Sequence, residues 1–181
     1  MHNFKNLNLL LSLLMLATAT LTFTSCGDDD DTVDVENRLI IDGTSYDLES
    51  GFLTDFGSNG NGSFDFDIYL ADDGITIQNG DLSGTGNGIY LDLNSGLETG
   101  LESGTYTFSI NREPFSFVGG TAAFTNFNFS TVSGTLINVT SGTVVMDITG
   151  NTYDIDLDLQ GLNGANQVDI TGNFNGVLQE F

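Results

Sequence analysis

Apolar and polar residues alternate one by one along much of the chain beyond residue 37. In segment 64–70, Phe, Ile and Leu occupy every second position, and Asp or Tyr stands between them. Segment 153–159 repeats the pattern, with aspartates between Tyr, Ile and Leu. A period of two is that of a β-strand with one buried face and one face in water. No stretch after residue 26 has apolar residues at helical spacing over three turns, so the pattern predicts an all-β domain.

Turn signals divide these alternating segments. The pair Asp42-Gly43 between two apolar runs predicts a hairpin. The glycine-rich segments 57–62 and 80–88 are predicted to be loops, and the Ser-Gly-Thr triplets at 133–135 and 141–143 are each expected to open a strand. Turns at this frequency are typical of sandwiches and barrels, and strands with one wet face pair antiparallel. We therefore predict an antiparallel β-sandwich of roughly ten strands, with a closed meander β-barrel as the alternative.

The N-terminal segment has a different pattern. A polar start with Lys5 precedes a leucine-rich run at 7–16, and smaller residues then lead to Cys26. This is the order of a secretory signal peptide. The strongly apolar part is about half of the roughly 20 residues that a membrane-spanning helix needs, and aspartates rather than Lys or Arg follow it. We interpret residues 1–25 as a signal peptide, 26–37 as a flexible acidic tether and 38–181 as a single β domain.

The end of the apolar region carries a processing motif. Phe23, Thr24, Ser25 and Cys26 resemble the lipobox of bacterial lipoproteins, with Phe23 in place of the usual leucine. The resemblance implies lipid attachment at Cys26. Acyl chains would anchor the protein firmly to a membrane, because each buried CH₂ contributes about 0.8 kcal/mol. The alternative is cleavage at an ordinary signal site, which would leave Cys26 as a free thiol.

An acidic run follows the cysteine and consists of Asp28, Asp29, Asp30 and Asp31. It resembles the surface-export tethers of lipoproteins from the Bacteroidota, which implies a location in the outer membrane with the domain facing the cell exterior. The alternative is a solvated linker that is extended by self-repulsion. The triplet Asp31-Thr32-Val33 resembles the O-glycan acceptor motif of that group, so Thr32 is a candidate glycosylation site.

The second half of the domain carries a further resemblance. Segments 104–108, 141–144, 153–155 and 170–176 resemble the β domains of Bacteroidota surface lipoproteins. This resemblance implies a fold type and a location, and no activity.

Charge and residue content exclude several classes of function. The chain has 25 acidic residues against three Lys or Arg, a formal net charge of −22. Beyond residue 25 it has no His and no Lys, and its arginines are Arg38 and Arg112. Phosphate binding needs clustered Lys and Arg, so a nucleic-acid partner is excluded. Ser-His-Asp or Cys-His catalysis and a His/Cys zinc site cannot be built. Strong negative charge also favours a soluble monomer.

Carboxylates and aromatic rings are the remaining candidate chemistry. Asp72 and Asp73 lie in a predicted turn and are candidate calcium ligands, although turn chemistry alone explains them. No other cofactor is expected. Tyr69 and Tyr90 fall on strand faces opposite the apolar residues and are candidate ligand-facing aromatics. The phenylalanine-rich segment 115–129 is expected to pack in the core or to line an apolar pocket. The aspartates of segment 153–159 are expected to form a solvated face.

These observations favour a non-catalytic, surface-anchored lipoprotein that binds an unknown ligand or protein partner through a sheet face or loops. One alternative is a structural or accessory subunit of an outer-membrane surface assembly, joined through an exposed sheet edge. The other is a carboxylate-based glycoside hydrolase, which needs two carboxyl groups flanking a cleft. The sequence singles out no such pair, so an enzyme is not expected.

Overall fold

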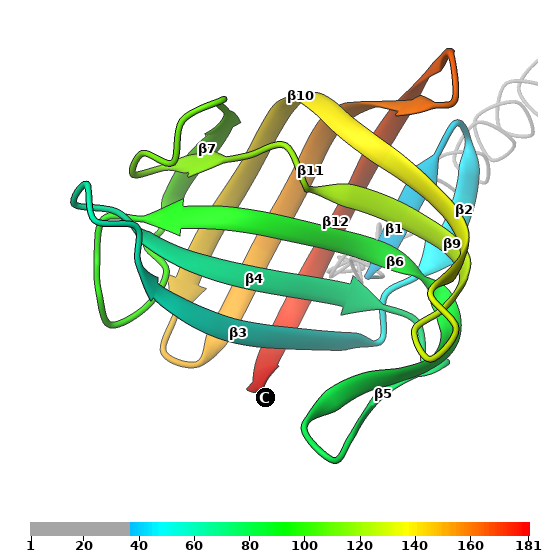
Figure 1. Ribbon diagram of the computed structural model, residues 1–181, viewed down its shortest axis with the longest axis horizontal. Helices are drawn as coiled ribbons and strands as arrows, with labels where there is room; N and C mark the ends of the chain where they lie inside the picture. Colours follow the sequence, from blue (N-terminus) through cyan, green and yellow to red (C-terminus); the bar gives the residue numbers. More distant parts are fainter. Residues whose placement is uncertain (1–36) are drawn as a thin grey trace, which may run out of the picture. The chain divides into compact units, whose positions relative to one another are not determined.

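The computed structural model describes residues 37–181, and the candidate residues Cys26, Asp28, Asp29, Asp30, Asp31 and Thr32 lie outside the described part. Val35–Phe181 forms one compact unit. The prediction of an all-β domain is confirmed, with twelve strands in place of roughly ten (Figure 1). Within the described residues, no helix is long and apolar enough to cross a membrane. The strands are β1 Arg38–Ile41, β2 Thr44–Asp47, β3 Ser50–Ser58, β4 Phe64–Ala71, β5 Ile75–Gln78, β6 Asp81–Ser95, β7 Gly104–Phe108, β8 Ser116–Phe117, β9 Ala122–Asn128, β10 Ser133–Thr149, β11 Thr152–Asn163 and β12 Asn166–Glu180.

The sheet closes on itself. Strands β10, β11 and β12 form a meander, and β10 pairs with both β7 and β9. The path continues through β6, β4 and β3, and β3 then pairs with β12 to complete the ring. The result is a closed eight-stranded barrel with extra strands outside it. The barrel, which was the alternative prediction, is therefore the architecture found, and the preferred sandwich is not confirmed.

Alternation along a strand could not separate the two architectures, because inward and outward residues alternate in both. Closure depends on a long-range parallel pair that sets Leu178 of β12 against Gly51 of β3. A second parallel pair joins β7 and β8, so the prediction of purely antiparallel pairing is wrong at these two places. Both contacts join segments that no hairpin connects, and the turn pattern carries no signal for them.

The predicted hairpin at Asp42-Gly43 is confirmed. Strands β1 and β2 pair antiparallel on either side of it. Both turn residues have positive φ, 48° at Asp42 and 79° at Gly43, which is the conformation of a two-residue hairpin turn. The β5–β6 hairpin, in contrast, extends away from the barrel (Figure 1).

The prediction of a glycine-rich loop at 80–88 is wrong, because β6 runs through most of it. The glycines stand where other backbone comes very close. A Cβ at Gly84 would overlap the carbonyl oxygen of Gly74, and one at Gly88 would overlap that of Leu70. Glycine inside a strand marks such an approach as well as a turn. The triplet at 141–143 was likewise expected to open a strand, but it lies inside one long strand, β10, which runs from Ser133 to Thr149. The pairing of β10 with β11 is irregular nearby, between Val139 and Ser141.

The main core is built from the inward residues of the strands. On β4 these are Phe66, Ile68 and Leu70, all buried, as the alternation predicted. The outward aspartates of segment 153–159 are exposed, which confirms the predicted solvated face. The phenylalanine-rich segment divides between sites. Phe117 belongs to the main core, whereas Phe124 and Phe127 belong to a second cluster.

The second cluster contains no inward residue of β4. It joins Phe52, Ala71, Ile75, Phe124 and Phe127, with Tyr69, Ile77, Leu82, Phe129 and Phe181 packed against it. Since Tyr69 and Ala71 are outward residues of β4, this cluster covers part of the barrel's outer face. The extra hairpin of β5 and β6 is therefore attached by an apolar contact of its own.

Candidate functional site

The outer face of β4 and β6 carries three cross-strand rows of polar or aromatic residues. Antiparallel pairing sets Tyr69 opposite Tyr90, Asp67 opposite Asp92, and Asp65 opposite Asn94. Apolar residues alternate with these along both strands and fill the core, so the same pattern that builds the barrel directs these side chains outward. These three rows place five ionisable side chains on one outward face of adjacent strands and form the candidate site.

The tyrosine row confirms the prediction that Tyr69 and Tyr90 lie on the faces opposite the apolar residues. Their rings stack with centroids 4.8 Å apart and an interplanar angle of 28°. The rings of Phe129 and Phe181 lie 6.0 and 6.3 Å from that of Tyr69 and are steeply inclined to it. Burial raises the pKa of Tyr69 to about 12, so this phenol stays neutral at ordinary pH.

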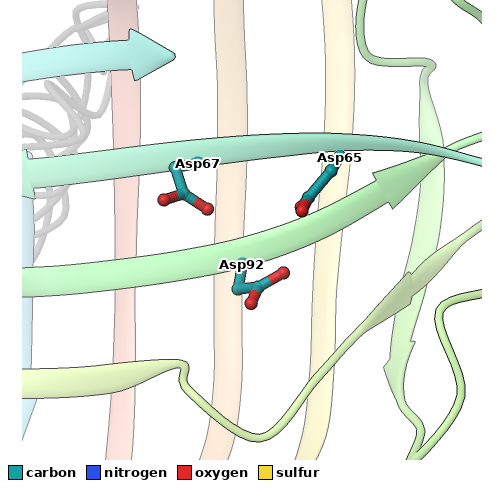
Figure 2. A group of neighbouring side chains, drawn as sticks. All are labelled: Asp65, Asp67 and Asp92. Carbon is teal, nitrogen blue, oxygen red and sulfur yellow. The ribbon is translucent and has the colours of Figure 1, made fainter. Parts of the chain in front are cut away.

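Two of these rows bring together three carboxylates, and the one on β6 is far from the other two in the sequence. Carboxylate oxygens of Asp65, Asp67 and Asp92 all lie within 4.8 Å of one another, and Figure 2 shows the two β4 side chains directed toward that of β6. Asp67 and Asp92 are only 8% and 6% exposed. Like charges directly opposite each other across a strand pair are destabilising. The negative charge of the three carboxylates therefore needs a nearby cation, and Arg112 supplies one.

Arg112 lies in the loop between β7 and β8 and joins two of the three acids. Its Nη1 and Nη2 atoms each donate a hydrogen bond of 2.8 Å to Asp92, and Nη1 lies 2.7 Å from Oδ2 of Asp65. Such a bidentate pair is stronger than an ordinary ion pair. The loop is fixed in turn by Ser63, whose hydroxyl donates to the Arg112 carbonyl over 2.9 Å.

Asp67 has a different environment from the other two acids. Arg112 makes ion pairs with Asp65 and Asp92 in the described structure but not with Asp67, which accepts a 2.8 Å hydrogen bond from the hydroxyl of Tyr90. Burial, and secondarily the charges of Asp92 and Asp65, raise the pKa of Asp67 to about 7. Burial also raises the pKa of Tyr90, which keeps its proton for this bond. Asp67 therefore titrates near neutral pH, and burial together with the charge of Asp92 also raises the pKa of Asp65.

These three carboxylates were not singled out from the sequence. Alternation placed Asp65 and Asp67 on an outward face, but their meeting with Asp92 requires the register of two strands that β5 separates in the chain. Arg112 lies in a loop without periodicity, so only the scarcity of cations could have indicated it.

The acidic trio is a poor cation site. Calcium takes six to eight oxygen ligands at about 2.3–2.6 Å. Arg112 already occupies both oxygens of Asp92 and one of Asp65, so a metal would have to displace its guanidinium. The remaining oxygen of Asp65, Oδ1, is buried and has no hydrogen-bond donor among the described residues. That oxygen and the second oxygen of Asp67, beside a bound guanidinium, do not amount to a ligand set for calcium.

The structure gives Asp72 and Asp73 different positions. The Asp72 carboxylate accepts hydrogen bonds from the backbone N–H of Gly74 and from the backbone and side-chain N–H groups of Asn87, over 2.7–3.1 Å. Asp73 is exposed. Both line a depression of about 320 Å³ together with Asp47 and Glu49. Asp72 thus stabilises the turn, and calcium binding there remains a prediction.

A larger groove lies beside the acidic and tyrosine rows. It has a volume of about 740 Å³. Thr54, Asp67 and Tyr69 on β3 and β4 contribute to one side, and residues 78–83 of the β5–β6 hairpin contribute to another. The remaining lining comes from Ser130 and the rings of Phe56, Phe129 and Phe181. We call this feature the outer groove. Of the two tyrosines predicted to face a ligand, Tyr69 lines it, whereas Tyr90 reaches it only through its bond to Asp67.

Comparison of the chain with protein-family models, with curated proteins and with solved structures gave no match. Functional inference therefore depends on the geometry of the site.

Proposed function

We propose that this protein is a non-catalytic lipoprotein of the Bacteroidota type, anchored in the outer membrane through acyl chains on Cys26, and that it binds a small ligand in the outer groove. The observation that supports binding is the groove itself, whose volume of about 740 Å³ falls in the range of small-molecule sites. Its lining combines four aromatic rings with many hydrogen-bonding side chains, so it is more polar than most small-molecule sites and suits a polar or charged ligand.

The accessory-subunit alternative receives less support. The edge strands β2 and β5 have four residues each, too short to offer a long uncovered edge for a neighbouring sheet. A specific observation favours the hydrolase alternative as the second candidate. Asp67 has a pKa raised to about 7, which suits a general acid, and Asp81 lies in the same groove on the β5–β6 hairpin. In that mechanism Asp67 would protonate the leaving group and Asp81 would act as base or nucleophile.

The binding proposal is tested by screening glycans, amines, short peptides and small apolar compounds against the full-length protein. Phe56→Ala in the groove and Val177→Ala on β12 form a matched pair, because the two side chains are 63% and 62% exposed and neither change should impair folding. We expect the first variant, and not the second, to weaken binding of any true ligand. If no compound class binds, or if both variants behave alike, the groove is not the site. Turnover of a bound glycan that is lost in Asp67→Asn would establish the hydrolase instead.

The anchoring proposal has its own test. Cys26→Ala should abolish incorporation of labelled fatty acid and release the protein from membranes, and persistent labelling would contradict lipidation at this residue. Replacing Asp28, Asp29, Asp30 and Asp31 with Asn should leave lipidation intact but keep the protein from the cell surface. Unchanged protease accessibility on whole cells would show that the run is a plain linker.

A further inference from the structure

The outer groove has an unusual charge balance. Two carboxylates line it, those of Asp67 and Asp81, and no Lys, Arg or His does. The arginines of the described residues are Arg38 on β1 and Arg112, and Arg112 is paired with Asp65 and Asp92. Arg112 forms no ion pair with Asp67. Among residues 37–181, therefore, no cationic side chain lines the groove.

The aromatic rings of the groove are inclined to one another, an arrangement that can surround a compact group. The Tyr69 ring stacks on Tyr90, so one of its faces is already covered. Phe129 and Phe181 meet Tyr69 at interplanar angles of 73° and 62°. A cation is attracted to the faces of aromatic rings, so rings that are inclined to one another can surround it.

We propose that the outer groove binds an organic cation through its alkylammonium group, with Asp67 as the ion-pair partner and the rings of Tyr69, Phe129 and Phe181 around its carbon atoms. This inference rests on the proposed function and names the ligand class of the same site. Asp67 supplies the charge, the rings supply cation–π attraction, and Asp81 adds a second carboxylate on the hairpin side. The strongly acidic chain further attracts cations at a distance.

Binding of a cation should depend on the ionisation of Asp67. Its pKa is raised to about 7, so the affinity for a cation of fixed charge should rise about tenfold between pH 6 and pH 8 as the carboxylate forms. The titratable or charged groups that face or flank Asp67 are Asp65 and Tyr69 on its own strand, Asp92 and Tyr90 on β6, Arg112 from the β7–β8 loop, and Asp81 on the hairpin. Neither Asp67 nor its Tyr90 partner bears a charge when the carboxyl is protonated, which explains why affinity should fall at low pH.

The test is calorimetric titration of the full-length protein in non-ionic detergent with choline, and with 3,3-dimethyl-1-butanol, which has the same shape and no charge. We expect choline to bind at least about tenfold more tightly than the alcohol. Asp67→Asn should remove most of this difference and the pH dependence. The matched control is Asp156→Asn on the exposed face of β11, which should leave choline affinity unchanged. Putrescine and a short lysine-containing peptide distinguish a free amine from a lysine side chain as the natural source of the group.

Each outcome decides a different claim. Equal binding of choline and its neutral analogue in the groove would overturn the cation proposal and leave the binding function in place. Equal weakening by Asp67→Asn and Asp156→Asn would mean that cations are attracted to the acidic surface in general, which also overturns it. Binding of neither probe, nor of putrescine or the peptide, overturns the cation proposal. If the broader compound screen is also negative, the proposed function fails with it.

Discussion

Replacing Asp67 with Asn should make the protein more stable above neutral pH. The Asp67 carboxyl is 8% exposed, stands opposite Asp92 and forms no ion pair with Arg112. Asn has nearly the same shape. Its Oδ1 can still accept the hydrogen bond from Tyr90, and its Nδ2 can donate to Asp92 across the strand pair. The substitution therefore removes the ionisation and retains the packing.

The size of the effect follows from the pKa. The pKa of Asp67 is raised from 3.8 in the unfolded chain to about 7 in the folded protein. Both states hold the proton below the lower value, and there the wild type keeps its full stability. As the pH rises, the unfolded chain releases the proton first, and stability is lost until the folded carboxyl also ionises near pH 7. A difference of about three pKa units corresponds to a loss of about 4 kcal/mol. Asn does not titrate and escapes this loss.

Urea denaturation measures the difference. Because the chain has no Trp, far-ultraviolet circular dichroism is the suitable signal. With a urea dependence of about 2 kcal/mol per molar, the midpoint of Asp67→Asn should exceed that of the wild type by up to about 2 M at pH 8, and by almost nothing at pH 4. Asp156→Asn, an exposed change on β11, should alter the midpoint little at either pH.

Two results would refute this reasoning. A gain of the same size at both pH values would mean that Asn improves packing and that ionisation is not the cause. A loss of stability at pH 8 would mean that the Asp67 carboxylate is stabilised by partners that the geometry does not show.

Three further predictions concern other parts of the barrel. Arg112→Met should lower the free energy of unfolding by about 2–3 kcal/mol at pH 8, less than for a fully buried pair because Arg112 is 38% exposed. The loss should be smaller at pH 5, where protonation of Asp67 relieves the repulsion among the three carboxylates. Equal losses at both pH values in urea denaturation would contradict this. Gly88→Ala should destabilise by about 1–3 kcal/mol because its Cβ would overlap the Leu70 carbonyl, whereas Gly119→Ala, with open space around it, should be nearly neutral in the same thermal melts; similar melting temperatures for both would refute the steric argument. Tyr106→Phe should cost about 1–2 kcal/mol, because the buried hydroxyl exchanges hydrogen bonds of 3.0 and 3.1 Å with the backbone of Glu102, and a wild-type urea midpoint would show that these bonds contribute nothing.

Local pattern predicted the parts of the fold that depend on neighbours in sequence. The hairpin at Asp42-Gly43 and the alternation along β4 and β11 were predicted because turn chemistry and a period of two act over a few residues. Closure of the barrel could not be predicted from local pattern, because the pairing of Leu178 with Gly51 joins opposite ends of the domain. Alternation also does not mark where a strand ends. Tyr106, Phe108 and Ile110 alternate in the sequence, yet β7 ends at Phe108 and Ile110 is 89% exposed in the loop.

The candidate site shows the same division. Alternation identified Tyr69 and Tyr90 as outward, and the structure adds that they face each other. The acidic trio with Arg112 depends on register and on the path of a loop, and neither leaves a periodic trace. The glycines of β6 were misinterpreted for a related reason, since a close approach between strands and a flexible loop both select glycine.

The presence of a carboxyl group at position 67 is the strongest argument that this face of the barrel has a function. Folding alone would be served better by Asn, which keeps the bond from Tyr90 without a buried charge opposite Asp92. Groups that lower stability and titrate near neutral pH occur preferentially at functional sites. Arg112 balances part of the charge of Asp65 and Asp92, although burial and the charge of Asp92 still raise the pKa of Asp65. Asp67 is the acid of the trio that both lacks that balance and lines the outer groove, so its charge is available to a ligand. If Asp67→Asn is more stable and also loses cation binding, the difference in free energy of unfolding between the two proteins at pH 8 is the stability lost by keeping a carboxylate at this site.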